Sequence, residues 1–400
     1  MKTVMKCLLC GICLLTLLIA GALAEKKAED ITSKCRFTSA VNDKKIKNIK
    51  SDNYKVYWDG GEKGSLRVTC PSGKKAQGVM VSVFRDVAEM TFVDTDGTIL
   101  AEYRDRYATE YIPFALPSGD FEIRYDGHGV PVKINRLRVL GEGELPDWAQ
   151  RWEELDGDAE LMLISTHPDD EILWFGGMLP TYAGELGKKV IVVYMVGGMN
   201  GMRTSELLDG LWAMGVHTYP DIGALPDVTG ASLNAARQHW GGDDVAPRRV
   251  TKAIRKYRPQ VVATQAVNGE YGHYHHIITT QAAIDAVTRL AADPSYDPDS
   301  ARAYGAHQVQ KLYLHLWKEG QVKFDWRKPL RAFNGRTGLE VARQAFRMHA
   351  SQRASRYRVH DSGRLDCSLF GLYYSAVGPD EKGDDLFEHI GQGDEDNEAV

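Results

Sequence analysis

Cysteine is scarce in this chain, which excludes two ways of building a protein. The 400 residues include six cysteines, three of them within the first 24 residues. The other three, Cys35, Cys70 and Cys367, are too few for a disulfide scaffold, and their spacing does not fit a zinc cluster. An exported protein can keep a disulfide, and Cys35 with Cys70 is then the expected pair. A catalytic metal, if present, is not expected to be held by sulfur.

Dense basic runs are also missing. The formal net charge is −5, and it becomes −7 without the first 24 residues, which contribute Lys2, Lys6 and no acids. This mild acidity argues against nucleic acid or an anionic membrane as a partner. A hydrophobic content of 43% with 26% charged residues is typical of a soluble globular protein. The length allows two domains of roughly 100–200 residues each, and the sequence leaves the oligomeric state open.

The first 24 residues have the pattern of a secretory signal peptide. Two lysines begin it, residues 7–18 are apolar, and Ala22-Leu23-Ala24 is a small-x-small cleavage site. The apolar run is short for a membrane span and lacks a charged stop. We therefore expect cleavage after Ala24, a secreted or extracytoplasmic protein, and no stable membrane span after cleavage. An uncleaved anchor is the alternative interpretation.

Residues 35–140 are predicted to form a small β-sandwich. Short runs at 54–58, 78–84 and 121–125 alternate apolar and polar residues, and turn signals such as Asp96-Gly97 separate them. Short strands at this spacing are typical of a sandwich. The region is weakly similar to galactose-binding-like sandwiches.

The aromatic residues of this region allow two interpretations. Aromatic faces stack on sugar rings, so the region could be a carbohydrate-binding module. The alternation along the strands favours packing in the core of the sandwich instead. The residues concerned are Tyr54, Tyr57, Trp58, Phe84, Tyr103, Tyr107 and Tyr111.

Residues 155–390 have a different pattern, after a boundary rich in glycine and acids at 141–146. Apolar runs that read as buried strands alternate with segments at helical spacing, which predicts βαβ units and a mostly parallel, Rossmann-like sheet. The expected strands are 161–164, 190–195 and 261–264, and the expected helices include 206–214 and a segment ending before Pro259. A strand at 310–316 alternates, which suggests a place nearer an edge. Residues 391–400 are predicted to be a disordered acidic tail.

His167-Pro168-Asp169-Asp170-Glu171 follows the first of these strands. Proline and acids at a helix start are common, so the acids could serve only the helix N-terminus. That interpretation leaves His167 unexplained. A loop at the carboxyl end of a buried strand is where open α/β sheets place ligands, and His167 with Asp170 could there share one metal ion.

A second cluster, Gly272-His273-Tyr274-His275-His276, follows the strand at 261–264. His273 and His276 are three apart and would share a helix face, whereas His275 is expected to point elsewhere. Catalytic zinc takes three nitrogen or oxygen ligands and keeps one position for water. The bound water is acidified, and a neighbouring carboxylate can accept its proton.

The two motifs together resemble the PIG-L/LmbE-like family of zinc-dependent N-deacetylases, whose signatures are His-Pro-Asp-Asp-Glu and Gly-His-x-x-His. The similarity extends to the helix beginning at Arg203-Thr204-Ser205-Glu206-Leu207, to Leu225-Pro226-Asp227 and to Arg258-Pro259. It covers about 159–290. Tyr274-His275 departs from the Pro-Asp that the family often has there, and this departure is expected to alter the pH response of His273.

The resemblance implies roles for seven residues. His167, Asp170 and His276 would bind the metal. Asp169 would be the general base and then the acid for the leaving amine, and His273 would stabilise the oxyanion or share the proton transfer.

Arg203 and Asp227 would hold sugar hydroxyls. The alternative for Arg203 is an ordinary ion pair with Glu206 or Glu185. Two later segments, 349–352 and 370–373, also look like features of exported members; packing is the preferred interpretation of the second.

The implied activity is removal of an N-acetyl group from an amino sugar or N-acetylglucosamine-containing glycoconjugate, by attack of a metal-activated water. Zinc (Zn2+) is the expected cofactor, and the same ligands accept Fe2+ or Co2+. Two alternatives stay open. One is a non-catalytic glycan-binding protein, and the other is a zinc amidohydrolase acting on another acyl amide.

Overall fold

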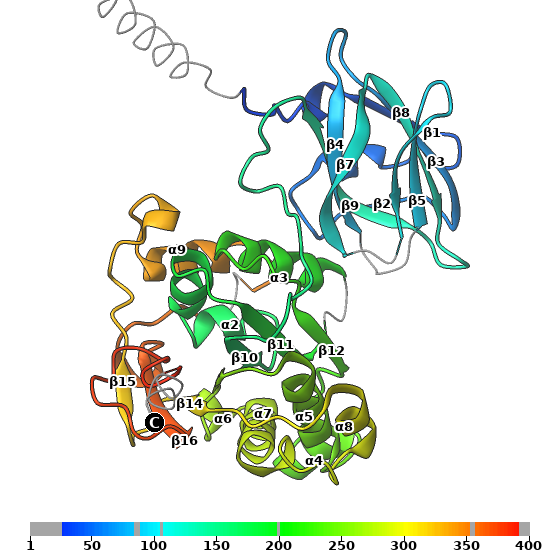
Figure 1. Cartoon of the computed structure of the whole chain (residues 1–400). Helices are drawn as coiled ribbons and strands as arrows, with labels where there is room; N and C mark the ends of the chain where they lie inside the picture. The colour runs from blue at the N-terminus through cyan, green and yellow to red at the C-terminus, as the bar shows by residue number, and fades with distance from the viewer. Residues whose placement is uncertain (1–25, 84–88, 105–106, 198–200, 353–356, 392–400) are drawn as a thin grey trace, which may run out of the picture.

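The chain folds into a β-rich region and an α/β region (Figure 1). The structure, a computed structural model, describes residues 26–83, 89–104, 107–197, 201–352 and 357–391. The expected signal peptide lies outside these residues, as do residues 392–400 of the expected tail. Within the described ranges, no helix is both long and apolar enough to cross a membrane.

The β-rich region consists of two antiparallel sheets, with strand orders β1-β3-β8-β5-β6 and β2-β9-β4-β7. Buried side chains from both sheets, among them Phe92 of the first and Val79 of the second, belong to one core. The strands are β1 Arg36–Ser39, β2 Trp58–Asp59, β3 Lys63–Thr69, β4 Ala76–Val83, β5 Glu89–Asp94, β6 Ile99–Tyr103, β7 Thr109–Ser118, β8 Asp120–Asp126 and β9 Lys133–Gly141. The predicted strands at 78–84 and 121–125 are confirmed as β4 and β8 within their described residues.

The predicted strand at 54–58 is wrong, because only Trp58 of that run is in β2. Asn53 turns the chain instead: its side-chain oxygen accepts from the Lys55 amide at 3.0 Å, and its carbonyl accepts from the Val56 amide at 3.0 Å. Such local bonds compete with a strand ladder. Alternation alone therefore misplaced this segment.

Most of the aromatic residues singled out in this region pack inside it. Tyr54, Trp58, Tyr103 and Tyr111 are buried, whereas Phe84 lies outside the described residues. Burial of these four rings supports the core-packing interpretation, since a buried face is not available to stack on a sugar.

The expected Cys35–Cys70 disulfide is not formed in the structure, where both are free thiols. The pairing of β1 with β3 sets Arg36 opposite Thr69, so the two cysteines lie opposite each other just beyond the paired segment. Their side chains form a hydrogen bond. The prediction holds for proximity but not for the bond.

The α/β region has a seven-stranded sheet in the order β12-β11-β10-β13-β14-β16-β15. The first five strands are parallel, and β16 and β15 are antiparallel additions. The strands are β10 Leu161–Ser165, β11 Val190–Val196, β12 Asp221–Leu225, β13 Val261–Thr264, β14 Lys311–His315, β15 Gln321–Lys323 and β16 Leu369–Ser375. The predicted strands at 161–164, 190–195 and 261–264 are confirmed.

Helices flank this sheet (Figure 1). They are α2 Asp170–Leu173, α3 Gly201–Ala213, α4 Leu233–His239, α5 Val245–Tyr257, α6 Gly269–Gly272, α7 Tyr274–Asp285, α8 Pro298–Tyr304 and α9 Gly338–Phe346. Two π-helical turns are Pro180–Glu185 and Ala286–Leu290, and four 3-10 turns are Thr32–Lys34, Ile46–Lys50, Arg331–Phe333 and Gly363–Leu365. The helix predicted before Pro259 is confirmed as α5, which ends with Arg258 in a left-handed conformation.

The prediction that 310–316 lies nearer an edge is wrong. Strand β14 lies between β13 and β16, and its five residues are buried. Its polar side chains have internal partners: the Lys311 ammonium donates to the Glu388 carbonyl at 2.9 Å, and the Tyr313 hydroxyl donates to Asp380 at 2.6 Å. Polar residues on a strand therefore marked internal networks here and not solvent.

The two regions meet at α3. Its Asp209 accepts hydrogen bonds from Arg136 of β9 at 2.9 Å, from the Tyr54 hydroxyl and from Gln150. The side chains of Arg136 and Asp209 are each 11% exposed. A nearly buried ion pair thus joins the β-rich region to the α/β region.

Candidate metal centre

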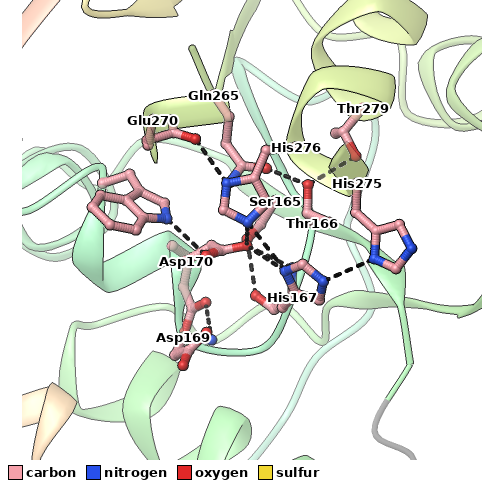
Figure 2. A network of polar contacts seen from close by, with 12 residues as sticks. Ser165, Thr166, His167, Asp169, Asp170, Gln265, Glu270, His275, His276 and Thr279 are labelled. Carbon is pink, nitrogen blue, oxygen red and sulfur yellow. Dashed lines mark hydrogen bonds and ion pairs between the residues drawn. The ribbon is translucent and has the colours of Figure 1, made fainter. Parts of the chain in front are cut away.

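Three side chains from the two predicted motifs converge at the carboxyl ends of β10 and β13. These strands are adjacent and parallel, so the loops that follow them meet at one edge of the sheet. Asp170 Oδ2 lies 3.1 Å from His167 Nδ1 and 3.2 Å from His276 Nε2, and the two nitrogens are 3.2 Å apart (Figure 2). All three residues are buried.

This triangle has the dimensions of a metal site. Ligands about 2.0–2.1 Å from a tetrahedral zinc ion are about 3.3 Å from one another. The three observed separations, 3.1, 3.2 and 3.2 Å, are close to that length. Two imidazole nitrogens and one carboxylate oxygen are also donors that zinc accepts. The residues present therefore fit the expected ion.

A buried carboxylate behind the triangle orients one of its imidazoles. Glu270 Oε2 lies 2.7 Å from His276 Nδ1, and Glu270 Oε1 lies 3.1 Å from His315 Nδ1 (Figure 2 shows the first pair). A proton on His276 Nδ1 leaves the Nε2 lone pair facing Asp170 and His167. Such carboxylate–histidine pairs fix the tautomer of metal-binding histidines.

Sequence reasoning missed Glu270 and His315. Glu270 had a signal, since it is a lone acid six positions before His276 in the second motif. His315 had only its place in the strand 310–316, and its partnership depends on β14 lying beside β13.

The electrostatics of the triangle favour positive charge. Burial raises the pKa of Asp170, but the charge of His276 and hydrogen bonds from both imidazoles hold that pKa well below its usual range. Burial lowers the pKa of His276, but Asp170 and Glu270 outweigh it and raise the pKa to about 10. Groups that stabilise a proton on His276 also favour a cation in the same place.

Asp169 lies beside the triangle in an unusual backbone conformation. Its φ is 124°, a region that non-glycine residues rarely adopt, and its amide donates to Glu171 Oε2 at 2.8 Å. Burial raises the pKa of Asp169 to about 7, opposed by Arg203 and supported by the neighbouring carboxylates. Helix α2 begins at Asp170, so Pro168 is not its first residue, and the helix-start interpretation of the motif is wrong.

His273 precedes the first turn of α7 and faces the same centre. Its ring stacks on that of His276 with centroids 4.4 Å apart. Burial, together with the positive charges of His276 and His167, lowers the pKa of His273 to about 3. The imidazole is therefore neutral near pH 7.

The prediction that His275 points elsewhere is wrong. Its Nδ1 lies 3.2 Å from Nε2 of His167, on the side of that ring opposite Asp170 and His276 (Figure 2). The His275 ring is buried and stacks on Trp240 with centroids 4.5 Å apart. Helical spacing separated His275 from His276, but the loop before α7 brings His167 between them.

Arg203 contacts the loop that carries Asp169. Its guanidinium donates to the Pro168 carbonyl, lies 3.6 Å from Asp169 Oδ2, and donates to the Ser351 hydroxyl at 3.2 Å. Glu206 lies 3.8 Å away. The alternative partner Glu185 instead accepts from the Ala332 amide. The structure thus brings Arg203 to the centre, and its role with sugar hydroxyls stays a prediction.

Asp227 lies at the opening of the site. Its Oδ1 is 3.4 Å from His167 Nε2, and its side chain is 46% exposed. A cavity of about 370 Å³ joins Asp227 to Asp169, Asp170, His273 and Arg203. All seven predicted site residues thus lie in or directly beside one cavity.

The segment 349–352, noted without a role in the sequence, contributes to the wall of this cavity. Ser351 and Gln352 line it, and Ser351 is held by Glu206, which accepts from its amide at 2.7 Å and its hydroxyl at 2.6 Å. Residues 370–373 belong to β16, and Phe370 is buried against Phe175, in agreement with the packing interpretation.

Comparison with known proteins agrees with this geometry. The family described as PIG-L, GlcNAc-PI de-N-acetylase, matches residues 162–287. The chain is 30% identical over 180 residues to 1D-myo-inositol 2-acetamido-2-deoxy-alpha-D-glucopyranoside deacetylase 1 of Catenulispora acidiphila, covering 38% of this chain and 54% of the relative. It is 31% identical over 179 residues to the enzyme of that name from Geodermatophilus obscurus, covering 38% of this chain and 60% of the relative.

The chain thus spans less than two thirds of the length of these relatives. Among solved structures, it is similar to N,N'-diacetylchitobiose deacetylase from Pyrococcus horikoshii, with 20% identity and a TM-score of 0.36, covering 50% of this chain and 72% of that one. The sequence match contains both histidine motifs. Through residues 162–287, this chain carries a domain of the PIG-L family.

Proposed function

We propose that the protein is a metal-dependent N-deacetylase that hydrolyses the acetamide of an amino sugar or an N-acetylglucosamine-containing glycoconjugate. The observation that carries this proposal is the triangle of His167, Asp170 and His276 beside the buried Asp169 in one cavity. Membership of the domain in the PIG-L family supports it.

His167, Asp170 and His276 would hold the ion, with Glu270 orienting His276. We propose zinc, and the same donors accept Fe2+ or Co2+. A bound zinc ion supplies a Lewis acid for the acetamide carbonyl and an acidified water as nucleophile. Positive charge from the ion is balanced by Asp170, whose pKa lies well below its usual range.

Asp169 is suited to accept and return the proton. A general base works best when its pKa is near the working pH, and burial raises the pKa of Asp169 to about 7. Its carboxylate takes a proton from the attacking water and returns it to the leaving amine. Arg203 at 3.6 Å limits this rise in pKa and fixes the loop.

His273 would stabilise the oxyanion that forms from the acetamide carbonyl. Its pKa is lowered to about 3, so the neutral ring can donate one hydrogen bond without carrying a proton to be lost. A preorganised donor aimed at developing charge is among the larger contributions to catalysis.

An N-acetylated sugar is the proposed substrate class. The printed names of the relatives describe deacetylases of a 2-acetamido-2-deoxy-glucopyranoside. Asp227 at the opening of the cavity and Arg203 on its wall are the groups proposed to hold sugar hydroxyls. The cavity of about 370 Å³ accommodates a single sugar ring with its acetamide.

Two further parts of the proposal concern the whole chain. The strand order of the α/β region supports a Rossmann-like arrangement. The lysines, apolar run and Ala22-Leu23-Ala24 site support export after cleavage.

The test is amine release from a panel of N-acetylated sugars by the zinc-loaded protein, beside a chelated control. Metal-dependent release that requires Asp169 supports the proposal. Release only from longer acyl amides would favour the other amidohydrolase class. Retained metal with no release from any amide would favour a glycan-binding protein and contradict the proposal.

A further inference from the structure

The imidazole of His167 has polar partners at both of its nitrogens. Nδ1 faces Asp170 and His276, the triangle described above. Nε2 faces a different pair, His275 Nδ1 at 3.2 Å and Asp227 Oδ1 at 3.4 Å. The proposed zinc site uses only the Nδ1 side, so the second set of partners has no assigned purpose.

The atoms around Nε2 also have the spacing of metal ligands. The third separation, between His275 Nδ1 and Asp227 Oδ1, is 3.9 Å. Two edges of this second triangle thus lie near the length of about 3.3 Å expected between tetrahedral zinc ligands. The longer edge ends at Asp227, whose side chain is 46% exposed and can move closer without disturbing the core.

A further donor is near. One ring nitrogen each of His167, His273 and His275 lies within 4.8 Å of the others. The plane of His275 is fixed by its stacking on Trp240 at an angle of 22°. Three imidazoles and a carboxylate are a donor set suited to zinc, cobalt or nickel.

We propose that His167, His275 and Asp227 form a second site for a divalent transition-metal ion. His273 supplies its fourth donor. The second ion replaces the proton on His167 Nε2, which passes to solvent, and the ring then bridges the two ions through its two nitrogens. The second site differs from the first in ligands and in position, because only His167 is shared.

Occupation of this second site has a consequence that rests on the proposed function. Asp227 and His273 are the groups assigned there to the sugar and to the oxyanion. An ion bound to both removes them from the substrate, so metal in excess of one equivalent inhibits deacetylation. The site therefore couples the rate to the free metal concentration.

Metal stoichiometry tests the site directly. The full chain is stripped with a chelator and titrated with Co2+, whose absorption reports coordination, and bound ions are counted by elemental analysis after removal of free metal. We expect two ions per wild-type chain and one ion in His275→Asn. Asp227→Ala, changed at the opening of the cavity, is expected to bind the second ion at least tenfold more weakly.

His128→Asn is the matched control. His128 is an exposed histidine of the β-rich region with a φ of 48°, a conformation that asparagine tolerates, so this variant should keep two ions. Retention of the first ion by His275→Asn shows that the variant is folded.

One outcome corresponds to a simpler role, in which His275 only forms a hydrogen bond with His167. In that case the wild type binds a single ion even at several equivalents of Co2+, and the proposal is overturned. Two ions in His275→Asn would overturn it as well. These counts do not depend on turnover, so failure of the deacetylase proposal is seen separately, as absence of amine release at one equivalent of metal.

Discussion

The β-rich region and the α/β region bury different kinds of side chain. The core between the two antiparallel sheets is made of rings and aliphatic groups such as Trp58, Phe92 and Ile123. The α/β region also has an apolar core, but at the carboxyl ends of β10 and β13 it buries carboxylates and imidazoles together. These are His167, Asp169, Asp170, Glu171, Glu270, His275, His276 and His315.

This difference separates a folding role from a chemical one. Burying an ionisable group costs free energy unless it is paired, so apolar side chains would have given a more stable edge of the sheet. The α/β region pairs its buried groups in a set whose pKa values are shifted in opposite directions, as for Asp169 and Asp170. Such opposed shifts mark functional sites.

The strongest test of this contrast is Asp169→Asn. Amide nitrogen and oxygen cannot accept the proton, so we expect the rate to fall about 10²- to 10⁴-fold, the usual contribution of a general base. Metal content should stay at the wild-type value, because Asp169 is not one of the triangle's ligands. Amine release and elemental analysis measure both. Asp243→Asn, at a carboxylate with 81% exposure, is the control; metal loss in Asp169→Asn would instead make Asp169 a ligand.

Asp209→Ala tests how far the two regions are independent. It removes the carboxylate that Arg136, Tyr54 and Gln150 share and leaves the Arg136 guanidinium nearly buried. Loss of one partner of a buried pair costs about 3–5 kcal/mol. We expect denaturant unfolding of this variant to separate into two transitions with the metal site intact. Asp243→Ala should unfold as the wild type does, and an unchanged curve for Asp209→Ala would show that the pair does not join the regions.

Glu270→Gln weakens the α/β site without touching a ligand. The carboxylate holds His276 by a contact of 2.7 Å, and loss of such outer partners lowers metal affinity about 10- to 100-fold. Competition with a chromogenic chelator measures the affinity. Glu340→Gln, at an acid that caps α9 far from the triangle, should leave it unchanged. Equal affinity in Glu270→Gln and wild type would remove the orienting role.

Arg203→Met is expected to have the smallest effect, on the pH profile. Asp169 must be deprotonated to act, so activity is lost as pH falls through its pKa. Arg203 lowers that pKa, and its removal raises it, which moves the acid limb of kcat/KM to higher pH. Arg237→Met, at a cation that pairs with Asp243 outside the site, is the control. A limb that moves to lower pH would contradict the assignment of Asp169 as the base.

Local patterns in the sequence were enough for the central sheet and for the ligand triangle. Continuous apolar runs identify the buried strands β10, β11 and β13, because strands covered on both faces have no polar side. A motif directly behind such a strand must lie at the carboxyl edge of the sheet. His167, Asp170 and His276 could therefore be brought together before any strand order was known.

Tertiary structure alone decided the remaining contacts. The place of β14 between β13 and β16, the partnership of His315 with Glu270, and the approach of His275 to His167 all join residues at least 45 positions apart. Periodicity describes which side of a strand or helix a residue takes, but not which neighbour that side meets. The neighbour is set by strand order and by the path of the loops, and these depend on how the whole chain buries its apolar surface.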